Sequence, residues 1–179
     1  MAVLPIVIMG DTVLHSPASR VGEITDDVRT LVADMYDTMD AAPGLGLAAP
    51  QVGVGLRIFV YNYTDDDGEP WRGGVINPEL WIAPLEPGFP DPDEESEGCL
   101  SFPGERFPLR RSDRALLTGT DLEGAPVHIE VDGWRARILQ HEFDHLDGII
   151  YIDRLDDSDW KTTQKIARKR GWGKPGASW

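Results

Sequence analysis

The sequence HEFDH at residues 141–145 constrains the fold of this chain more than any other feature. Two histidines four residues apart lie on one face of an α-helix, with their Cβ atoms about 5–6 Å apart, so both imidazoles can reach one metal ion. Glu142 projects beside that face, where it could handle protons for a metal-bound water. The spacing therefore predicts a helix that carries a metal site. The alternative is a charged helix turn that faces solvent.

The third ligand of such a site must come from another part of the chain, because hydrolytic metal sites usually have three protein ligands and one open position. In zincin proteases it is a histidine or glutamate further downstream, but after His145 this chain offers only aspartates. The single cysteine, Cys99, is the other candidate. A lone cysteine is most often inert and buried. Beside the HEFDH helix, however, one thiolate and two imidazoles form a ligand set with room for water, so we predict Cys99, His141 and His145 as ligands.

The composition is that of one ordinary globular domain, with 179 residues, 41% of them hydrophobic and 27% charged. A formal net charge of −14 argues against nucleic acid as the main partner, because phosphate would be repelled. One cysteine excludes an internal disulfide and fits a reducing cytosol. No signal peptide is recognisable, and no stretch approaches the roughly 18 apolar residues of a membrane span. We therefore predict a cytoplasmic protein without membrane contact.

The first half of the chain contains one strong helical pattern. Residues 25–42 predict an amphipathic helix that Thr25 caps and Pro43 ends. Residues 57–63 alternate like a strand, and residues 64–70 have the composition of a loop. The proline-rich and acidic residues 83–98 predict irregular structure throughout.

The second half predicts a hairpin followed by two helices. Residues 114–120 and 127–131 read as strands on either side of the turn DLEGAP. A helix is expected from a cap at Asp132 through HEFDH to a stop near Gly148. Residues 158–170 predict a short basic helix, followed by a frayed tail rich in glycine. This order of elements predicts a single α+β domain with antiparallel strand pairing.

Three sequence blocks occur in a fixed order along the chain: GLGLAAPQ at 44–51, EGCLS at 97–101 and QHEFDHLDG at 140–148. Together they resemble the G-x-G-x-A-A-x-Q, E-G-C-L-S and H-E-x-x-H motifs of the bacterial peptide deformylase family, without a mismatch. The resemblance extends from the segment PIVIMGDTVLHSPA to about Arg154. It implies a catalytic domain over residues 1–155, followed by a basic helix and tail over residues 156–179. The proline-rich acidic loop before Glu97 and the basic tail depart from the family pattern.

The resemblance implies an activity, a cofactor and a fold. Members of this family remove the N-formyl group from the initiator methionine of new polypeptides and release formate. They use one divalent metal ion, commonly Fe²⁺ in the cell and Zn²⁺, Ni²⁺ or Co²⁺ in some preparations. The family fold is α+β, with antiparallel sheets around a central helix that carries the two histidines. The expected partners are therefore N-formylmethionyl nascent peptides.

Residue roles follow partly from chemistry and partly from the resemblance. Chemistry predicts that Glu142 takes a proton from the attacking water and returns it to the departing amine. The tetrahedral oxyanion needs further donors, and the resemblance assigns these to the Gln51 side-chain amide and the Leu100 backbone N–H. Without the resemblance, Gln51 reads as a polar turn residue. The glycines of GLGLAAPQ form either a simple turn or a close backbone approach to a ligand, and the resemblance favours the second, with Gly46 binding substrate.

A methionine pocket is suggested by helix geometry. Trp134 and Ile138 share one helical face with His141 and His145, so they line either an apolar pocket beside the metal or the ordinary core. Leu45 and Arg106 join this pocket only through the resemblance. Acidic residues near a metal-bound histidine often orient it rather than ligate, and we expect this of Glu97 and Asp144.

The C-terminal residues 161–179 contain six basic residues and no acidic one, in an otherwise acidic chain. Such a patch can dock on RNA by counterion release, which suggests contact with the ribosome. The alternative is a solvated tail. Two other functions compete with deformylation: a metallopeptidase, which Cys99 in EGCLS argues against, and a structural zinc module or deformylase-like binding protein. Glu142 and Gln51 argue against the latter, because neither is needed merely to hold zinc.

Overall fold

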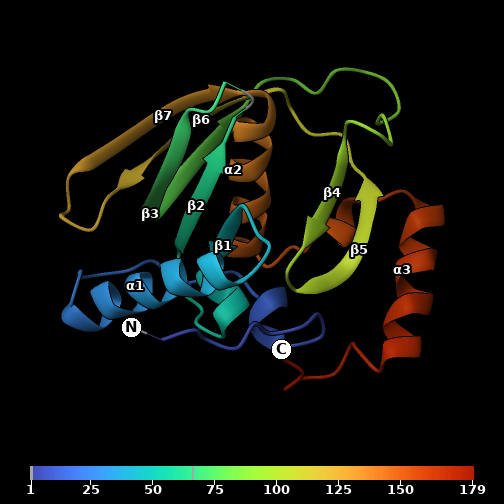
Figure 1. Cartoon of the computed structure of the whole chain (residues 1–179), viewed down its shortest axis with the longest axis horizontal. Coiled ribbons are helices and arrows are strands. Elements are labelled where there is room, and N and C mark those ends of the chain that lie inside the picture. Colours follow the sequence, from blue (N-terminus) through green and yellow to red (C-terminus); the bar gives the residue numbers. More distant parts are fainter. Residues whose placement is uncertain (1, 66) are drawn as a thin grey trace.

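The computed structural model describes residues 2–65 and 67–179. The opening segment 1–10 and the predicted loop 64–70 each include one residue outside these ranges. Within them the chain forms a five-stranded sheet, a separate two-stranded hairpin and three α-helices (Figure 1). The α-helices are α1 (Asp26–Ala41), α2 (Gly133–Leu146) and α3 (Asp157–Arg170), and the 3-10 turns are η1 (Thr12–His15), η2 (Ala49–Val52) and η3 (Tyr151–Arg154). The strands are β1 (Gly46–Ala48), β2 (Ile58–Thr64), β3 (Pro70–Ile82), β4 (Ser96–Cys99), β5 (Phe102–Pro108), β6 (Arg114–Thr120) and β7 (Pro126–Asp132).

The five-stranded sheet has the order β1-β2-β3-β6-β7, and every neighbouring pair is antiparallel. Helix α2 packs on this sheet, where Ile138 and Leu139 join Phe59, Val75 and Leu117 in one buried cluster. Figure 1 shows α2 standing between the sheet and the β4–β5 hairpin. The prediction of an α+β domain with antiparallel sheets around the HEFDH helix is thus confirmed.

Helix α1 confirms the predicted helix at residues 25–42. The Thr25 hydroxyl accepts a hydrogen bond from the Val28 N–H at 3.4 Å, which satisfies one of the free donors at the helix start. The apolar side chains at helical spacing, Val28, Val32, Met35 and Met39, are all buried in a second core cluster.

Helix α2 begins and ends close to the predicted positions. Asp132 occupies the predicted cap position, although its side chain makes no capping hydrogen bond there. The helix ends at Leu146, and Gly148 follows with a φ of +76°. A Cβ at position 148 would lie 2.7 Å from the Ser16 backbone nitrogen, so only glycine allows the chain to turn here.

The prediction of irregular structure over residues 83–98 is wrong at its end, because β4 begins at Ser96. The prolines that indicate a loop lie at residues 84–92, and the segment Ser96–Cys99 has none, so it pairs with β5. Strand β3 was also not expected. Its prolines and glycines obscure the strand pattern, and a bulge interrupts its pairing with β6 between Ile76 and Glu79.

The C-terminal tail is ordered along the N-terminal segment, so the prediction that it frays is wrong. Ile6 and Trp179 exchange two backbone hydrogen bonds of 2.9 and 3.0 Å. The Trp172 side chain packs edge-on against Phe102, with ring centroids 5.2 Å apart. The glycines of the tail indicate disorder, and the sequence alone does not show that the tail packs on the N-terminal segment and Phe102. Figure 1 places the two termini on the same end of the molecule.

Helices long and apolar enough to cross a membrane are absent from residues 2–65 and 67–179.

Candidate metal centre

Three potential ligand atoms converge between α2 and the β4–β5 hairpin. Cys99 stands at the last position of β4, and His141 and His145 lie one turn apart on α2. The Cys99 Sγ is 3.3 Å from the His145 Nε2, and this nitrogen is 3.3 Å from the His141 Nε2. The three predicted ligands are thus brought together within 4.8 Å of one another.

The donor set fits one small divalent metal ion. Metal–nitrogen bonds of about 2.0–2.1 Å and metal–sulfur bonds of about 2.3 Å in a tetrahedron separate the donor atoms by about 3.3–3.6 Å. The observed 3.3 Å separations match this range. All three residues are also buried, so solvent screens the electrostatic interactions at the site only weakly.

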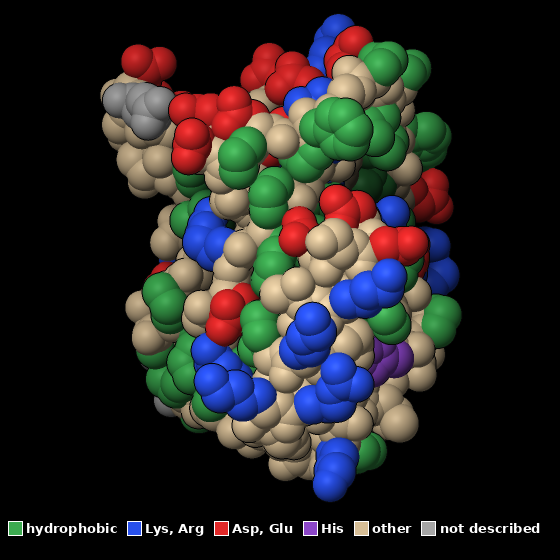
Figure 2. Space-filling view, turned by 90° about the vertical axis from the view of Figure 1, so that its right-hand side faces the viewer, with side chains coloured by type: hydrophobic (Ala, Val, Ile, Leu, Met, Phe, Trp, Pro, Cys, Tyr) green, Lys and Arg blue, Asp and Glu red, His purple; other side chains and the backbone are tan. Residues whose placement is uncertain are grey.

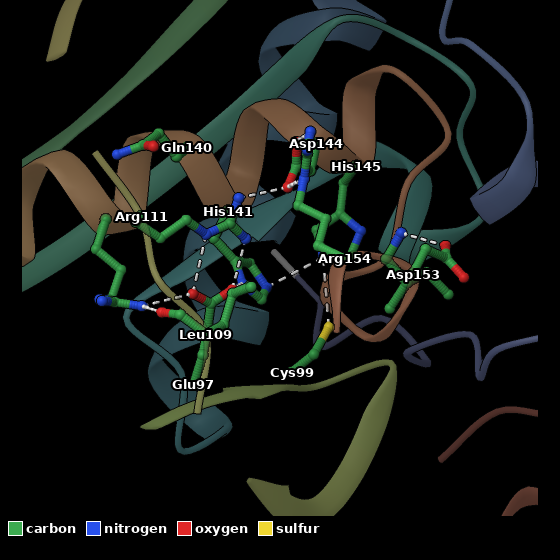
Figure 3. A network of polar contacts seen from close by, with 12 residues as sticks. Glu97, Cys99, Leu109, Arg111, Gln140, His141, Asp144, His145, Asp153 and Arg154 are labelled. Carbon is green, nitrogen blue, oxygen red and sulfur yellow. Dashed lines mark hydrogen bonds and ion pairs between the residues drawn. The ribbon is translucent and has the colours of Figure 1, made fainter. Parts of the chain in front are cut away.

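Glu97 orients the first histidine. Its Oε1 lies 2.6 Å from the His141 Nδ1 (Figure 3), and this contact fixes the ring with its Nε2 edge towards Cys99 and His145. Arg111 and Arg137 also donate to the Glu97 carboxylate. Burial by itself would raise the pKa of Glu97, but His141 and Arg111 beside it hold that pKa well below its ordinary value.

A second buried carboxylate extends this network. Asp144 accepts from Arg111 at 2.6 Å and from the Arg154 Nε at 2.6 Å (Figure 3). Arg111 therefore links Glu97 to Asp144, and its side chain is only 5% exposed. Sequence reasoning expected an orienting role for the two acids but missed Arg111, Arg137 and Arg154. No local pattern marks an arginine whose partners lie on other elements.

The second histidine has a different environment. His145 is fully buried, and its Nδ1 has no hydrogen-bond partner among the described residues. Burial, together with the positive charges of His141 and Arg111, holds the pKa of His145 well below its ordinary value. The neutral imidazole is the form that can ligate a metal.

Glu142 is a buried carboxylate without a full set of partners. The side chain is 3% exposed, and Oε2 has no hydrogen-bond partner among the described residues. Burial raises its pKa to about 7. Its side chain lies against Gly46 of β1, where an added Cβ would be 2.7 Å from the Glu142 Cγ. The structure thus supplies a reason for glycine at position 46 that the sequence did not show.

Gln51 points its amide towards the same centre. Its Oε1 accepts from the Ala48 N–H at 2.9 Å, which leaves the Nε2 donor 3.6 Å from the Cys99 Sγ and 3.4 Å from the Ser101 Oγ. Leu100 follows Cys99 at the turn between β4 and β5. Both predicted oxyanion donors therefore come from segments that border the three ligand atoms.

A cavity of about 440 Å³ opens beside the centre. All of the residues predicted for substrate binding line it: Leu45, Gly46, Arg106, Trp134 and Ile138. Gln51, Cys99, Leu100, His141 and Glu142 line it too. Ile138 also belongs to the core cluster under the sheet. This residue therefore both lines the cavity and packs in the core, so the two predicted alternatives are both met. Trp179 lines the cavity as well and was not predicted.

Several known proteins with similar sequences and folds are peptide deformylases. The family model described as Polypeptide deformylase matches residues 3–161. A peptide deformylase of Mycolicibacterium paratuberculosis is 51% identical over 186 residues, which covers 100% of this chain and 94% of the relative. The crystal structure of the Ehrlichia chaffeensis peptide deformylase has a TM-score of 0.82 at 33% identity, covering 95% of this chain and 97% of that chain. A second structure of that protein, in complex with actinonin, has a TM-score of 0.81 at 35% identity, covering 94% and 98%.

Proposed function

The chain belongs to the peptide deformylase family, and we propose how its residues remove the N-formyl group from the N-terminal methionine of newly made polypeptides. The observation that carries the proposal is that Cys99, His141 and His145 converge at the wall of one cavity. Beside them lies a buried carboxylate, one oxygen of which has no hydrogen-bond partner among the described residues. Neither a structural metal site nor a simple binding pocket needs such an oxygen. A hydrolase needs it to take up a proton.

We propose Cys99, His141 and His145 as the residues that hold the metal. A divalent ion bound there would polarise the formyl oxygen and lower the pKa of a water molecule. The Cys/His₂ set suits several metals, and within that range we propose Fe²⁺, with Zn²⁺, Ni²⁺ or Co²⁺ able to replace it. Glu97 supports this role because it holds His141 with Nε2 free to ligate.

Glu142 moves the proton in this proposal. Its carboxylate accepts the proton of the water that attacks the formyl carbon, and it then delivers this proton to the nitrogen of the departing methionine. A group that first accepts and then donates works best when its pKa lies near the working pH. Because Oε2 has no hydrogen-bond partner among the residues that the structure describes, that atom is available for both steps.

Gln51 and Leu100 stabilise the negative charge that develops on the formyl oxygen. The Gln51 amide is held by the Ala48 N–H, so its Nε2 donor is already aimed at the centre before substrate arrives. Donors fixed in this way need no rearrangement during the reaction. The Leu100 N–H, adjacent to Cys99, supplies the second donor.

The substrate is held by backbone and apolar contacts. Strand β1 forms one edge of the sheet, so Gly46 has a backbone edge free to bond an extended peptide. Leu45, Trp134 and Ile138 surround the methionine side chain, and Arg106 stands at the cavity wall. Ile138 is 5% exposed and Leu45 is 43% exposed, so the pocket has one closed and one open side.

Contact with the ribosome is a further part of the proposal. We treat residues 1–155 as the catalytic part and residues 156–179 as a basic appendage. Lys161, Lys165, Arg168 and Lys169 are all exposed on α3. Figure 2 shows this side of the molecule, with Lys and Arg over its lower half and most Asp and Glu above. Such a local patch can bind RNA.

We also propose a cytoplasmic location, because newly made polypeptides are the substrate and a single cysteine is compatible with a reducing compartment.

Formate release tests the proposal directly. Protein purified without oxygen is assayed with a formyl-methionyl peptide, and its bound metal is measured on the same sample. We expect formate in proportion to the bound metal and no cleavage of the internal amide. Cleavage of internal peptide bonds without formate would instead indicate a metallopeptidase.

A further inference from the structure

The chain from residue 172 to residue 179, here called the C-terminal strap, is held against the N-terminal segment. Ile6 and Trp179 exchange two backbone hydrogen bonds, of 2.9 and 3.0 Å. The Ile8 N–H donates to the Ala177 carbonyl at 2.8 Å. The strap is thus paired like a short strand, which fixes the backbone position of Trp179.

The N-terminal segment in turn touches the functional site. The Val7 N–H donates to the Gln51 carbonyl at 2.8 Å, and the Met9 N–H donates to the Ser101 carbonyl at 2.9 Å. Gln51 borders the three ligand atoms, and Ser101 lies in the turn after Cys99. The N-terminal segment therefore lies between the backbone of the strap and the centre, and it fixes the position of the strap relative to the centre.

The Trp179 side chain extends from the strap to the cavity beside the centre. Its Nε1 donates to the Leu100 carbonyl at 2.8 Å, and the residue lines the same cavity as Cys99 and Glu142. Even so, Trp179 is 50% exposed. Because its N–H is already bonded, the rest of the indole offers only an apolar aromatic surface to an occupant of the cavity.

The position of this surface separates it from the methionine pocket. Trp134 and Ile138 lie on α2, on the face that carries His141, whereas Trp179 approaches from the turn of the β4–β5 hairpin. A cavity of about 440 Å³ also falls in the range of roughly 300–1,000 Å³ that holds whole small ligands. It therefore has room for substrate atoms beyond the formyl group and the first side chain.

We propose that Trp179 is a specificity-determining residue whose ring forms the wall of a downstream subsite. This subsite takes an apolar side chain, above all an aromatic one, from a residue that follows the formyl-methionine. The inference rests on the proposed deformylase function. It also gives the strap a role in substrate selection, distinct from any role of α3 in binding RNA.

The test compares peptides within one enzyme preparation. The ratio of kcat/KM for formyl-Met-Phe-Ala or formyl-Met-Ala-Phe to that for formyl-Met-Ala-Ala does not depend on the fraction of active enzyme. We expect wild type to prefer phenylalanine at one of these positions by roughly three- to tenfold, mostly through KM, because part of the ring becomes buried. Trp179→Ala should bring the ratio close to one.

Two further variants separate the ring from its hydrogen bond. Trp179→Phe keeps an aromatic ring without the N–H and should retain most of the preference. Trp179→Gln keeps a donor for the Leu100 carbonyl without the ring and should lose it, even where Trp179→Ala fails to fold. Trp81→Ala is the matched control, because Trp81 is 52% exposed but does not line the cavity. Thermal unfolding of each variant is recorded alongside.

The outcomes are distinct. If wild type releases no formate from any peptide, the proposed function fails. If wild type is active but shows no preference at either position, or if Trp179→Ala and Trp179→Gln keep the preference, the inference is overturned. A preference that survives in Trp179→Gln and disappears in Trp179→Phe would also overturn it, because the residue would then act only by holding Leu100.

Discussion

Two carboxylates in the centre are about equally buried, but their surroundings shift their pKa values in opposite directions. Glu97, on the hairpin side of α2, is 4% exposed and accepts hydrogen bonds or ion pairs from His141, Arg111 and Arg137. Glu142, on the cavity side, is 3% exposed, and within residues 2–65 and 67–179 its Oε2 has no hydrogen-bond partner. The pKa is lowered for Glu97 and raised to about 7 for Glu142. The first is thus a fixed charge that positions other groups, and the second can gain and lose a proton.

The largest expected effect, on the free energy of unfolding, follows from removing the arginine that neutralises Glu97 on the hairpin side. Arg111→Met removes the cation between Glu97 and Asp144, which are both buried. Leaving a buried charge without its partner typically costs about 3–5 kcal/mol, so the free energy of unfolding in urea should fall by that amount. Arg114→Met is the control, because its ion pair with Glu130 is mostly exposed and contributes below about 1 kcal/mol. Similar losses for both variants would show that the network is not structural.

A smaller effect is expected when the fixed charge alone is removed. Glu97→Gln keeps the size of the side chain but weakens its hold on the His141 ring. Loss of such an orienting partner lowers metal affinity by about 10–100-fold. Competition with a chelator measures this affinity, and an unchanged value would remove Glu97 from the support of the metal site.

The cavity side can be disturbed through Gly46. Gly46→Ala places a Cβ against the Glu142 side chain, so the carboxylate must move. A displacement of about 1 Å at a catalytic group can cost up to about 10²-fold in rate, and we expect a loss of kcat of about 10–10²-fold with metal retained. Gly22→Ala, with nothing within 4 Å of its added Cβ, should leave kcat unaltered. Equal effects of the two substitutions would contradict the close fit of Gly46 and Glu142.

The smallest effect concerns α3, whose basic side chains contribute to neither carboxylate. Reversal of charge at Lys165, Arg168 and Lys169 should leave activity on a short formyl peptide intact, because these exposed side chains do not line the cavity. It should weaken binding to ribosomes and make that binding less dependent on salt. Wild-type protein that does not bind ribosomes at low salt would restrict α3 to a solvated helix.

The sequence predicted the groups whose chemistry is local. The two histidines are one helical turn apart, so their convergence needed only a helix, and Cys99 followed from the scarcity of other donors. Helix α1 was equally accessible because its cap and apolar spacing lie within one segment. The contrast between Glu97 and Glu142 was not accessible, because it depends on the burial of both groups and on the approach of His141 and Arg111 to Glu97. Arg111 and Arg137 carry no pattern that distinguishes them from surface arginines.

Long-range packing also explains the other failures. The glycines of the strap indicate disorder in isolation, and the pairing of Trp179 with Ile6 joins opposite ends of the chain. Strand β3 contains prolines and paired glycines, which weaken a strand pattern until neighbouring strands stabilise it. In each case the deciding contact lies far away in the sequence.

The comparison of the two carboxylates is tested most directly by measuring kcat for formate release and bound metal on the same samples of wild type and Glu142→Gln. Glutamine preserves the size of the side chain but cannot accept the proton of water. The account predicts one metal bound per chain in both proteins and a loss of about 10²–10⁴-fold in kcat for the variant. Turnover close to wild type by metal-loaded Glu142→Gln would contradict the account.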